Sequence, residues 1–388
     1  MKSPLSAASV SASRARLAHP LASPTRIKQR LLAVPWTIVC LALILGTIGV
    51  FALYSAAGGD WSPWAWKHMI RIGIGLVMMT MIATIPIWHY RTLAPLGWIG
   101  AVLILLLLEF VGGGNGVQRW LSVGGFNLQP SEPAKLAVIL LLAAYFHAIN
   151  PELTRNIRTY IPAFIIALVP FVQVMLQPDL GTSIMLLAAA AAVIFVAGMP
   201  AWMIGSIAAM VIAAVPVIWS SLYPYQKDRI LVFLNPGADQ LGAGYQITQS
   251  KIALGSGGVL GKGYLQGSQA HLNYLPEKQT DFVFTMIGEE FGFFGSLVIL
   301  GLYIMLVGLL IRIGLRLKYQ FSRLMVIGIA TKLFLFVFVN IAMVTGMIPV
   351  VGAPLPLVSY GGTALMTVFI AIGLVISAVI YDQESANL

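Results

Sequence analysis

The sequence predicts an all-α, polytopic membrane protein with about ten transmembrane helices. Of its 388 residues, 59% are hydrophobic and only 9% are charged, against roughly 25% charged residues in ordinary soluble domains. Runs of about 20 apolar residues recur along the chain, and each can cross a hydrocarbon core of roughly 30 Å as a helix. Helices satisfy their own backbone polar groups in lipid. The runs lie near residues 35–55, 68–87, 93–111, 133–149, 159–177, 181–199, 202–222, 282–311, 323–346 and 363–381.

The basic residues predict how these helices are oriented in the membrane. The first 34 residues are basic and contain no acid, and further Lys and Arg residues fall in alternate connections. Cytoplasmic loops carry the excess of Lys and Arg, so both termini are predicted to be cytoplasmic. The net charge of +10 then encodes orientation. No basic motif with interleaved aromatic residues indicates nucleic-acid binding.

One domain is expected to account for nearly the whole chain. Residues 1–34 are predicted to be a disordered basic cytoplasmic tail, 35–381 the transmembrane domain, and 382–388 a short cytoplasmic tail. The first segment lacks the apolar core and cleavage site of a signal peptide, and its charge suits contact with anionic lipid. The single cysteine, Cys40, and five scattered histidines indicate neither a disulfide framework nor a zinc site.

The outward-facing connections are predicted to carry the function. They are more polar than the inward ones, and residues 223–281 form the longest, with 59 residues. Connections of that length are usually functional. Short interfacial helices are expected near 230–233 and 247–254. The glycine-rich run 255–263 lacks P-loop spacing and leaves two interpretations open: a backbone nest for phosphate or a flexible re-entrant turn.

Asp281 is the principal candidate for catalysis. It stands where the long polar loop meets a predicted membrane helix. The positive end of a helix dipole favours a carboxylate there by about 0.3–1 kcal/mol, and Thr280 is expected to cap the helix. These features predict an ionised acid that is available as a base or a metal ligand. An ordinary surface Asp at a helix start is the alternative.

Three ionisable residues are predicted to lie inside the membrane. Glu289 and Glu290 follow Asp281 by eight and nine residues, roughly 12–14 Å deeper along a helix. A charge at that depth costs at least about 2–3 kcal/mol, so both must face the bundle interior or a water-filled cleft. Lys332 reaches a similar depth in the next span. A structural Glu–Lys pair and a polar pathway are both open interpretations.

Three further polar clusters are predicted on the outer face. One combines residues 118–120 with 129–135, in which Glu132 and Lys135 share a helix face. A second is the Pro/Gly turn 177–183, which holds Asp179 at the surface. The third, 349–362, has too many Pro and Gly residues to be helical throughout, and is predicted to be a re-entrant loop lining a cavity. Together with Asp281 they predict one outer-leaflet site.

These motifs together resemble the SEDS family (shape, elongation, division and sporulation proteins). The resemblance covers about residues 35–380. Residues 348–352 are more similar to the elongation members than to the division members. Gln279, where His is commoner, and Lys332 depart from the family pattern. The matching runs are Gln118-Arg119-Trp120, Gln129-Pro130-Ser131-Glu132, Gln177 to Ser183, Gly242 to Tyr245, Thr280-Asp281-Phe282 and Val350 to Gly362.

The resemblance implies a peptidoglycan glycosyltransferase of cell elongation and rod-shape maintenance. Such an enzyme polymerises lipid II, the undecaprenyl-pyrophosphate-linked disaccharide-pentapeptide, at the outer face of the cytoplasmic membrane. Asp281 would be its general base or a metal ligand. A divalent cation such as Mg²⁺ suits a pyrophosphate leaving group, although no carboxylate cluster predicts a metal site. The candidate substrate-binding residues are Arg119, Glu132, Lys135, Asp179, Arg229, Lys251, Lys262 and Ser359.

The resemblance also implies a partner, the class B penicillin-binding transpeptidase (penicillin-binding protein 2), with other proteins of the elongation complex. Small residues permit close helix contact, so Gly346 with the segment 352–362 is a candidate docking groove. Two other functions remain open. One is a lipid II flippase, in which Glu289, Glu290 and Lys332 would line a pathway with Asn340. The other is a scaffold that only docks the transpeptidase.

Overall fold

The computed structural model describes residues 30–111, 119–123, 126–235, 237, 239, 242–272 and 274–385. In this part of the chain, ten long apolar helices correspond one for one to the predicted spans. Seven of the ten are long and apolar enough to cross a membrane. The protein is therefore an all-α, polytopic membrane protein, as predicted. The helices are α3 (Trp36–Ala56), α4 (Ala65–Thr84), α5 (Ile87–Val111), α6 (Ser131–Ala148), α7 (Tyr160–Leu176), α8 (Leu180–Val196), α9 (Ala201–Ser221), α13 (Val283–Arg316), α14 (Gln320–Val344) and α15 (Gly362–Ser385).

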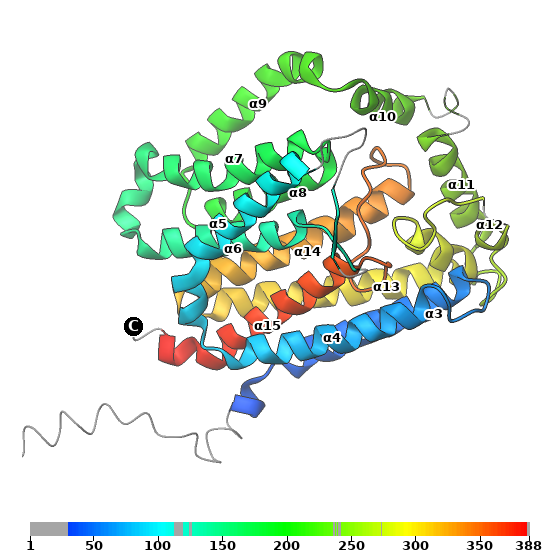
Figure 1. Ribbon diagram of the computed structural model, residues 1–388, viewed down its shortest axis with the longest axis horizontal. Helices are drawn as coiled ribbons and strands as arrows, with labels where there is room; N and C mark the ends of the chain where they lie inside the picture. Colours follow the sequence, from blue (N-terminus) through cyan, green and yellow to red (C-terminus); the bar gives the residue numbers. More distant parts are fainter. Residues whose placement is uncertain are drawn as a thin grey trace, which may run out of the picture.

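The long helices lie side by side along the long axis of the molecule (Figure 1). The predicted short helices of the long loop are confirmed as α10 (Pro224–Leu234) and α11 (Ala243–Ser256), followed by the single turn α12 (Ser268–His271). Figure 1 places α11 and α12 at the end of the bundle opposite the C-terminus. Two 3₁₀ turns, η1 (Pro151–Arg155) and η2 (Ile157–Thr159), connect α6 to α7.

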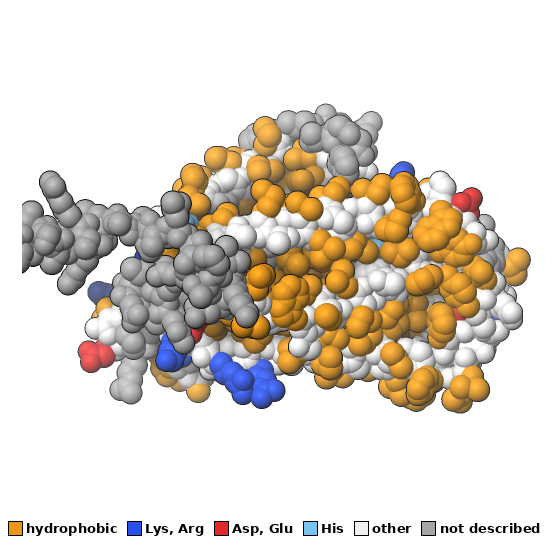
Figure 2. Space-filling model, turned by 90° about the horizontal axis from the view of Figure 1, so that it is seen from below, with side chains coloured by type: hydrophobic (Ala, Val, Ile, Leu, Met, Phe, Trp, Pro, Cys, Tyr) orange, Lys and Arg blue, Asp and Glu red, His pale blue; other side chains and the backbone are white. Residues whose placement is uncertain are grey.

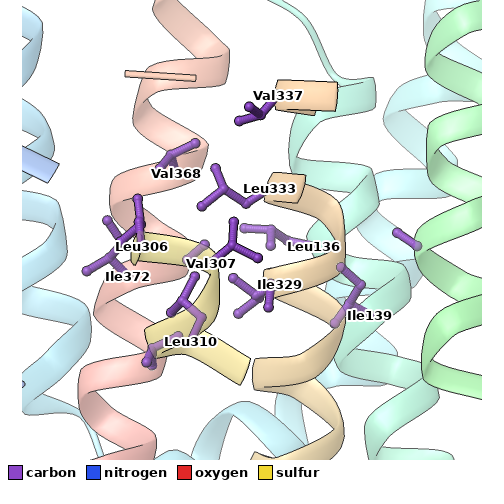
Figure 3. Close-up of a cluster of buried hydrophobic side chains, with 14 of the residues drawn as sticks. Leu136, Ile139, Leu306, Val307, Leu310, Ile329, Leu333, Val337, Val368 and Ile372 are labelled. Carbon is purple, nitrogen blue, oxygen red and sulfur yellow. The ribbon is translucent and has the colours of Figure 1, made fainter. Parts of the chain in front are cut away.

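Apolar side chains serve both the core and the outer surface of the bundle. Figure 2 shows hydrophobic side chains along the length of one face, with the visible charged groups near its two ends. Figure 3 shows the interior, where side chains of α6, α13, α14 and α15 point toward one another. Leu136, Leu310 and Ile329 are among these buried residues. Helices that are apolar all round are expected where one side faces the core and the other faces lipid.

A small hairpin between α5 and α6 departs from the purely helical expectation. Strand β1 (Leu121–Val123) pairs antiparallel with β2 (Phe126–Leu128). The hairpin is attached to the start of α15, because the hydroxyl of Thr363 accepts a hydrogen bond from the Gln129 amide (3.0 Å) and donates to the Asn127 carbonyl (3.2 Å). The predicted cluster 129–135 is thereby joined to the residue that directly follows the predicted segment 349–362.

Helix α13 is broken near its start. Gly292 has φ 66° and ψ −161°, a conformation that glycine adopts far more readily than other residues. The glycine-rich run lies against this break: the amides of Lys262 and Gly263 donate to the carbonyls of Glu289 and Glu290, both at 3.0 Å. These N–H groups are therefore used within the protein. The run packs against the first part of α13, before the break at Gly292. It therefore fits neither of the two sequence interpretations, the phosphate nest and the flexible turn.

The start of α13 also differs from the expected capping. The helix begins at Val283, and its N-cap, Phe282, makes no side-chain capping bond. Thr280 donates instead to the carbonyl (3.2 Å) and the carboxylate (3.0 Å) of Glu277. The prediction that Thr280 caps the helix is wrong, because the side chain is engaged by the preceding turn.

The structure describes the two ends of the chain only from residue 30 and up to residue 385. Residues 1–29 and 386–388 lie outside the described residues, and with them most of the predicted N-terminal tail. Helix α15 continues to Ser385, so it includes the first residues of the segment 382–388 that was expected to be a tail.

Candidate functional site

Asp281 lies in a short segment that is fastened to the connection between α14 and α15. Residues 348–359 of that connection are non-helical, as predicted for a re-entrant loop. The connection runs back into the bundle (Figure 1). Ser359 Oγ donates to the Thr280 carbonyl (2.5 Å), and the Tyr360 amide donates to the Gln279 carbonyl (2.8 Å). The two segments therefore form one wall, which fixes the backbone beside Asp281.

The Asp281 carboxylate is partly buried and receives no hydrogen bond or ion pair from the described residues. Burial raises its pKa to about 7, with further upward contributions from the charges of Glu277 and Asp179 and a downward contribution from Arg229. The prediction of an ionised acid is therefore wrong near neutral pH, where part of the carboxyl population is protonated. A carboxyl group with a pKa near neutrality can accept a proton and release it again, which is the property a general base needs.

The charge of Asp179 raises the pKa of Asp281. A fixed turn holds Asp179 in this position. It caps α8, accepting from the Thr182 amide at 3.3 Å, and its other oxygen accepts from Gln129 Nε2 at 3.4 Å. The Arg119 guanidinium donates to the carbonyls of Gln177 (3.3 Å) and Pro178, just before it. Arg119 is thus used to hold the turn together.

Arg229 approaches the same place from α10. Its Nη1 donates to the Val350 carbonyl at 3.0 Å, and its charge lowers the pKa of Asp281. Residues from the long loop, the 177–183 turn and the 349–362 segment therefore converge around Asp281. The sequence predicted that these three segments meet at one site.

Glu132 and Lys135 lie elsewhere, in a buried ion cluster within the bundle. Lys135 Nζ is 2.6 Å from one oxygen of Glu132, and Lys332 Nζ is 3.5 Å from the other. Lys135 also lies over the Phe336 ring, 4.2 Å from its centroid. All three charged side chains are nearly inaccessible to solvent.

The predicted pairing of Lys332 with Glu289 or Glu290 is wrong. Glu289 binds Lys262 of the glycine-rich run at 2.6 Å, and Glu290 accepts a hydrogen bond from Ser55 of α3. Lys332 faces α6 instead, where Glu132 is its partner. Depth along a helix was a poor guide here, because the direction that each side chain faces decides its partner.

Two more predicted binding residues have structural contacts. Ser359 is buried and, besides its bond to Thr280, accepts from the Leu355 amide at 2.8 Å. Lys251 is exposed on α11, and its aliphatic chain covers Gly346, where a Cβ atom would collide with it. Gly346 has φ +71°. The candidate docking groove at Gly346 is therefore covered by α11 at that residue.

The sequence reasoning missed a cavity of about 670 Å³ on the other side of the wall. Lys67 and Arg71 of α4 line it, together with Trp64, Gln279 and Tyr360. The available signal was orientation: in the predicted topology these two cations stand at the outer end of a span, against the usual preference for the cytoplasmic side.

Among the residues that the structure describes, no group of three or more His, Cys, Asp or Glu side chains is arranged to hold a metal ion. The acids whose charges raise the pKa of Asp281 are Glu277 and Asp179. Glu277 interacts with Thr280 and Gln279, and Asp179 serves as a helix cap.

The fold and the site define a multi-pass membrane protein with an acidic, partly buried polar site at one end of its bundle. The family model for the FtsW, RodA and SpoVE cell cycle proteins matches residues 33–384. The chain belongs to this family.

Known relatives cover nearly the same length. The chain is 41% identical over 344 residues to the peptidoglycan glycosyltransferase MrdB of Escherichia coli K12, covering 88% of this chain and 92% of that protein. It is 36% identical over 364 residues to stage V sporulation protein E of Bacillus subtilis 168, covering 89% and 97%.

Solved structures agree with this assignment. The rod shape determining protein RodA of Thermus thermophilus superimposes with a TM-score of 0.68 at 26% identity, covering 90% of this chain and 98% of that one. A chain from a peptidoglycan synthase complex, described as coordinating polymerization and crosslinking, gives a TM-score of 0.77 at 32% identity and covers 90% and 99%.

Proposed function

We propose that this protein is a peptidoglycan glycosyltransferase of cell elongation, which polymerises lipid II at the outer face of the inner membrane. The observation that carries the proposal is the Asp281 carboxyl, whose pKa is raised to about 7 and whose backbone is fixed in the wall described above. The relatives named peptidoglycan glycosyltransferase support the reaction class.

The proposed reaction is an inverting glycosyl transfer. The Asp281 carboxylate accepts the proton of the acceptor sugar hydroxyl as that oxygen attacks the anomeric carbon of the lipid-linked chain. A new carbon–oxygen bond forms, and the bond to the pyrophosphate breaks with its electron pair. A general base must lie within hydrogen-bond reach of the hydroxyl it deprotonates. An acid without a protein hydrogen-bond partner in the described residues is available for that contact.

Arg229 would support the base by favouring the ionised form of Asp281. A nearby cation favours the ionised form of a carboxyl group, and Arg229 has this effect on Asp281. Burial opposes it, so the acid is poised between its two forms near neutral pH. Asp179 acts through position and charge, because its oxygens already cap α8 and bind Gln129.

The proposed orientation has both termini in the cytoplasm and the site facing the periplasm. In support, α13 ends with Arg312 and Arg316 in its last turns, and the Lys318 amide that follows donates to Asp382 near the C-terminal end of α15. Cytoplasmic ends of membrane helices are enriched in such residues. The substrate would then be reached after it has crossed the bilayer.

A lipid II flippase is the alternative function. It would need polar residues along a common passage, and Glu289, Glu290, Lys332 and Asn340 were the candidates. Glu289 is paired with Lys262, Glu290 with Ser55, and Lys332 with Glu132. These contacts are separate from one another and do not form a common passage, so they favour the enzyme over the flippase.

Purified protein with lipid II tests the proposal. Wild type is expected to produce glycan polymer, and Asp281→Asn to produce none at unchanged expression, because the amide cannot act as the base. Asp60→Asn is the matched control, since Asp60 is exposed and bonds only to the nearby Ser62 amide in the described structure. Near-normal polymer length and rate from Asp281→Asn would remove this residue from the chemistry. Labelled lipid crossing a vesicle bilayer without polymer would indicate the flippase instead.

We also propose that the class B transpeptidase, penicillin-binding protein 2, is the partner that controls this activity. The similarity to a chain from a peptidoglycan synthase complex supports a partner that crosslinks what this protein polymerises. Co-purified transpeptidase is expected to raise the polymerisation rate several-fold. Equal rates with and without it would contradict the coupling. A complex that forms without any polymer from wild type would favour the scaffold function.

A further inference from the structure

The cavity on the α4 side of the wall carries an unbalanced positive charge. Lys67 and Arg71 lie one helical turn apart on α4 and both line it. The described lining contains no Asp or Glu; its other polar side chains are neutral, such as Gln279, Thr280 and Tyr360. Two cations that share a cavity without an acid are stabilised by an anionic ligand.

Arg71 is held in a fixed position. Its guanidinium lies over the Tyr360 ring, with Cζ 4.3 Å from the centroid. A Cβ atom at Gly362 would stand only 3.2 Å from the same carbon, so the glycine leaves just enough room for the side chain. A planar guanidinium stacked on an aromatic ring keeps its donors directed in a fixed plane.

One donor of Arg71 has no partner. Nη1 is buried and makes no hydrogen bond, and Arg71 forms no ion pair with a described acid. The positive charge of Arg71 is therefore balanced by no acid among the described residues. Oxygen atoms of a phosphate group fit the fork geometry of a guanidinium.

We propose that Lys67 and Arg71 bind the pyrophosphate of a lipid-linked sugar in this cavity. The inference rests on the proposed function and specifies it, because it separates the leaving group from the base. Gln279 and Thr280 face the cavity, whereas the Asp281 carboxylate lies toward Gly352, Asp179 and Arg229. In an inverting displacement the base acts on one side of the anomeric carbon and the leaving group departs on the other.

The surface of α4 indicates that the ligand is attached to lipid. Ile70 lines the cavity, and from it a stripe of exposed apolar side chains continues along the helix through Ile74, Val77 and Met81. Their spacing of three to four residues puts them on one face. A polyprenyl chain that leaves the cavity can follow this face within the bilayer, while its pyrophosphate stays with the two cations.

Binding to the full chain tests the site without the reaction. Each variant is made in the Asp281→Asn background, purified, and titrated with a polyprenyl pyrophosphate that carries no sugar. Arg71→Gln and Lys67→Gln are each expected to weaken binding about tenfold or more, since a charge-assisted contact contributes at least about that factor. Arg71→Lys should fall between Arg71→Gln and the parent. Arg316→Gln, which changes an exposed residue at the C-terminal end of α13, should leave the affinity unchanged.

An unchanged affinity in both Gln variants would overturn the site. Lys67 is exposed, so its variant carries the test if Arg71→Gln fails to fold. Inorganic pyrophosphate is expected to bind far more weakly than the lipid form. Equal affinities would overturn the assignment to a lipid-linked ligand. These results are separate from the polymerisation assay, in which the absence of polymer from wild type would contradict the enzyme itself.

Discussion

Asn340 joins the backbone of Asp281 to that of Ala353 through a single amide nitrogen. Its Nδ2 donates to the Asp281 carbonyl at 2.8 Å and to the Ala353 carbonyl at 2.7 Å. Asn340 is buried within α14, so a membrane-embedded helix fixes two loop segments that are far apart in the sequence. The position of the candidate catalytic acid depends on this contact.

Replacing Asn340 should therefore reduce activity without removing any group from the site. Asn340→Ala loses both bonds, and a displacement of about 1 Å in a catalytic group can cost roughly 100-fold in rate. We expect polymerisation to fall at least about tenfold, with substrate affinity little changed. Thr345→Ala is the control, because its hydroxyl bonds only to carbonyls of its own helix. An unaltered rate in Asn340→Ala would show that the wall holds Asp281 without this residue.

The pH dependence of polymerisation should report the ionisation of Asp281. With a pKa of about 7, the carboxylate that acts as base is formed as the pH rises through neutrality, so the rate should rise with a midpoint near pH 7. Arg229 lowers this pKa, so Arg229→Gln should move the midpoint to higher pH. Lys227→Gln, two residues away on α10, should leave it in place. A profile that does not respond to Arg229 would argue that another group titrates.

The same pKa predicts a pH-dependent effect on stability. The Asp281 pKa is raised from 3.8 to about 7 on folding, so between these values the folded protein binds a proton that the unfolded chain has released. Stability from this group is complete below about pH 4 and is lost as the pH rises through 7. Asp281→Asn does not titrate, so its melting temperature should exceed that of wild type at pH 8, and by less at pH 5.

Thermal unfolding in detergent at the two pH values measures this difference. Asp60→Asn should show no such trend, because Asp60 lies exposed in a loop. A stabilisation by Asp281→Asn that is equal at pH 5 and pH 8 would contradict the raised pKa.

The buried cluster of Glu132, Lys135 and Lys332 should show strong coupling. Glu132→Gln leaves two buried cations without an anion, and breaking a buried pair costs about 3–5 kcal/mol. Lys332→Met leaves the closer Glu132–Lys135 contact in place, so its cost should be smaller. The double variant Glu132→Gln with Lys332→Met should be more stable than Glu132→Gln alone.

Glu289 supplies the matched test of independence. Among the described residues it forms no ion pair with Lys332 and pairs with Lys262 instead. Glu289→Gln and Lys332→Met should therefore have additive effects on the free energy of unfolding. Clear non-additivity between them, measured by thermal unfolding, would restore the Glu289–Lys332 pairing that the structure replaces.

The sequence by itself determined the long apolar helices, their approximate limits and the polar segments around Asp281. Apolar runs and Pro/Gly-rich breaks are local signals, because lipid forces each run to satisfy its own backbone as a helix. Local signals also predicted the short helices α10 and α11 and the non-helical segment 349–362. Asp281 was recognisable as an acid at the end of a long loop.

Only the tertiary structure decided which side chains meet. Lys332 pairs with Glu132 and Glu289 pairs with Lys262, because a partner depends on the direction in which each helix faces. Arg71 and Tyr360 are 289 residues apart in the chain, yet their side chains stack at the cavity. Burial, which raises the pKa of Asp281, also arises only when the bundle has assembled. Contacts between distant segments follow from packing, and no local pattern records them.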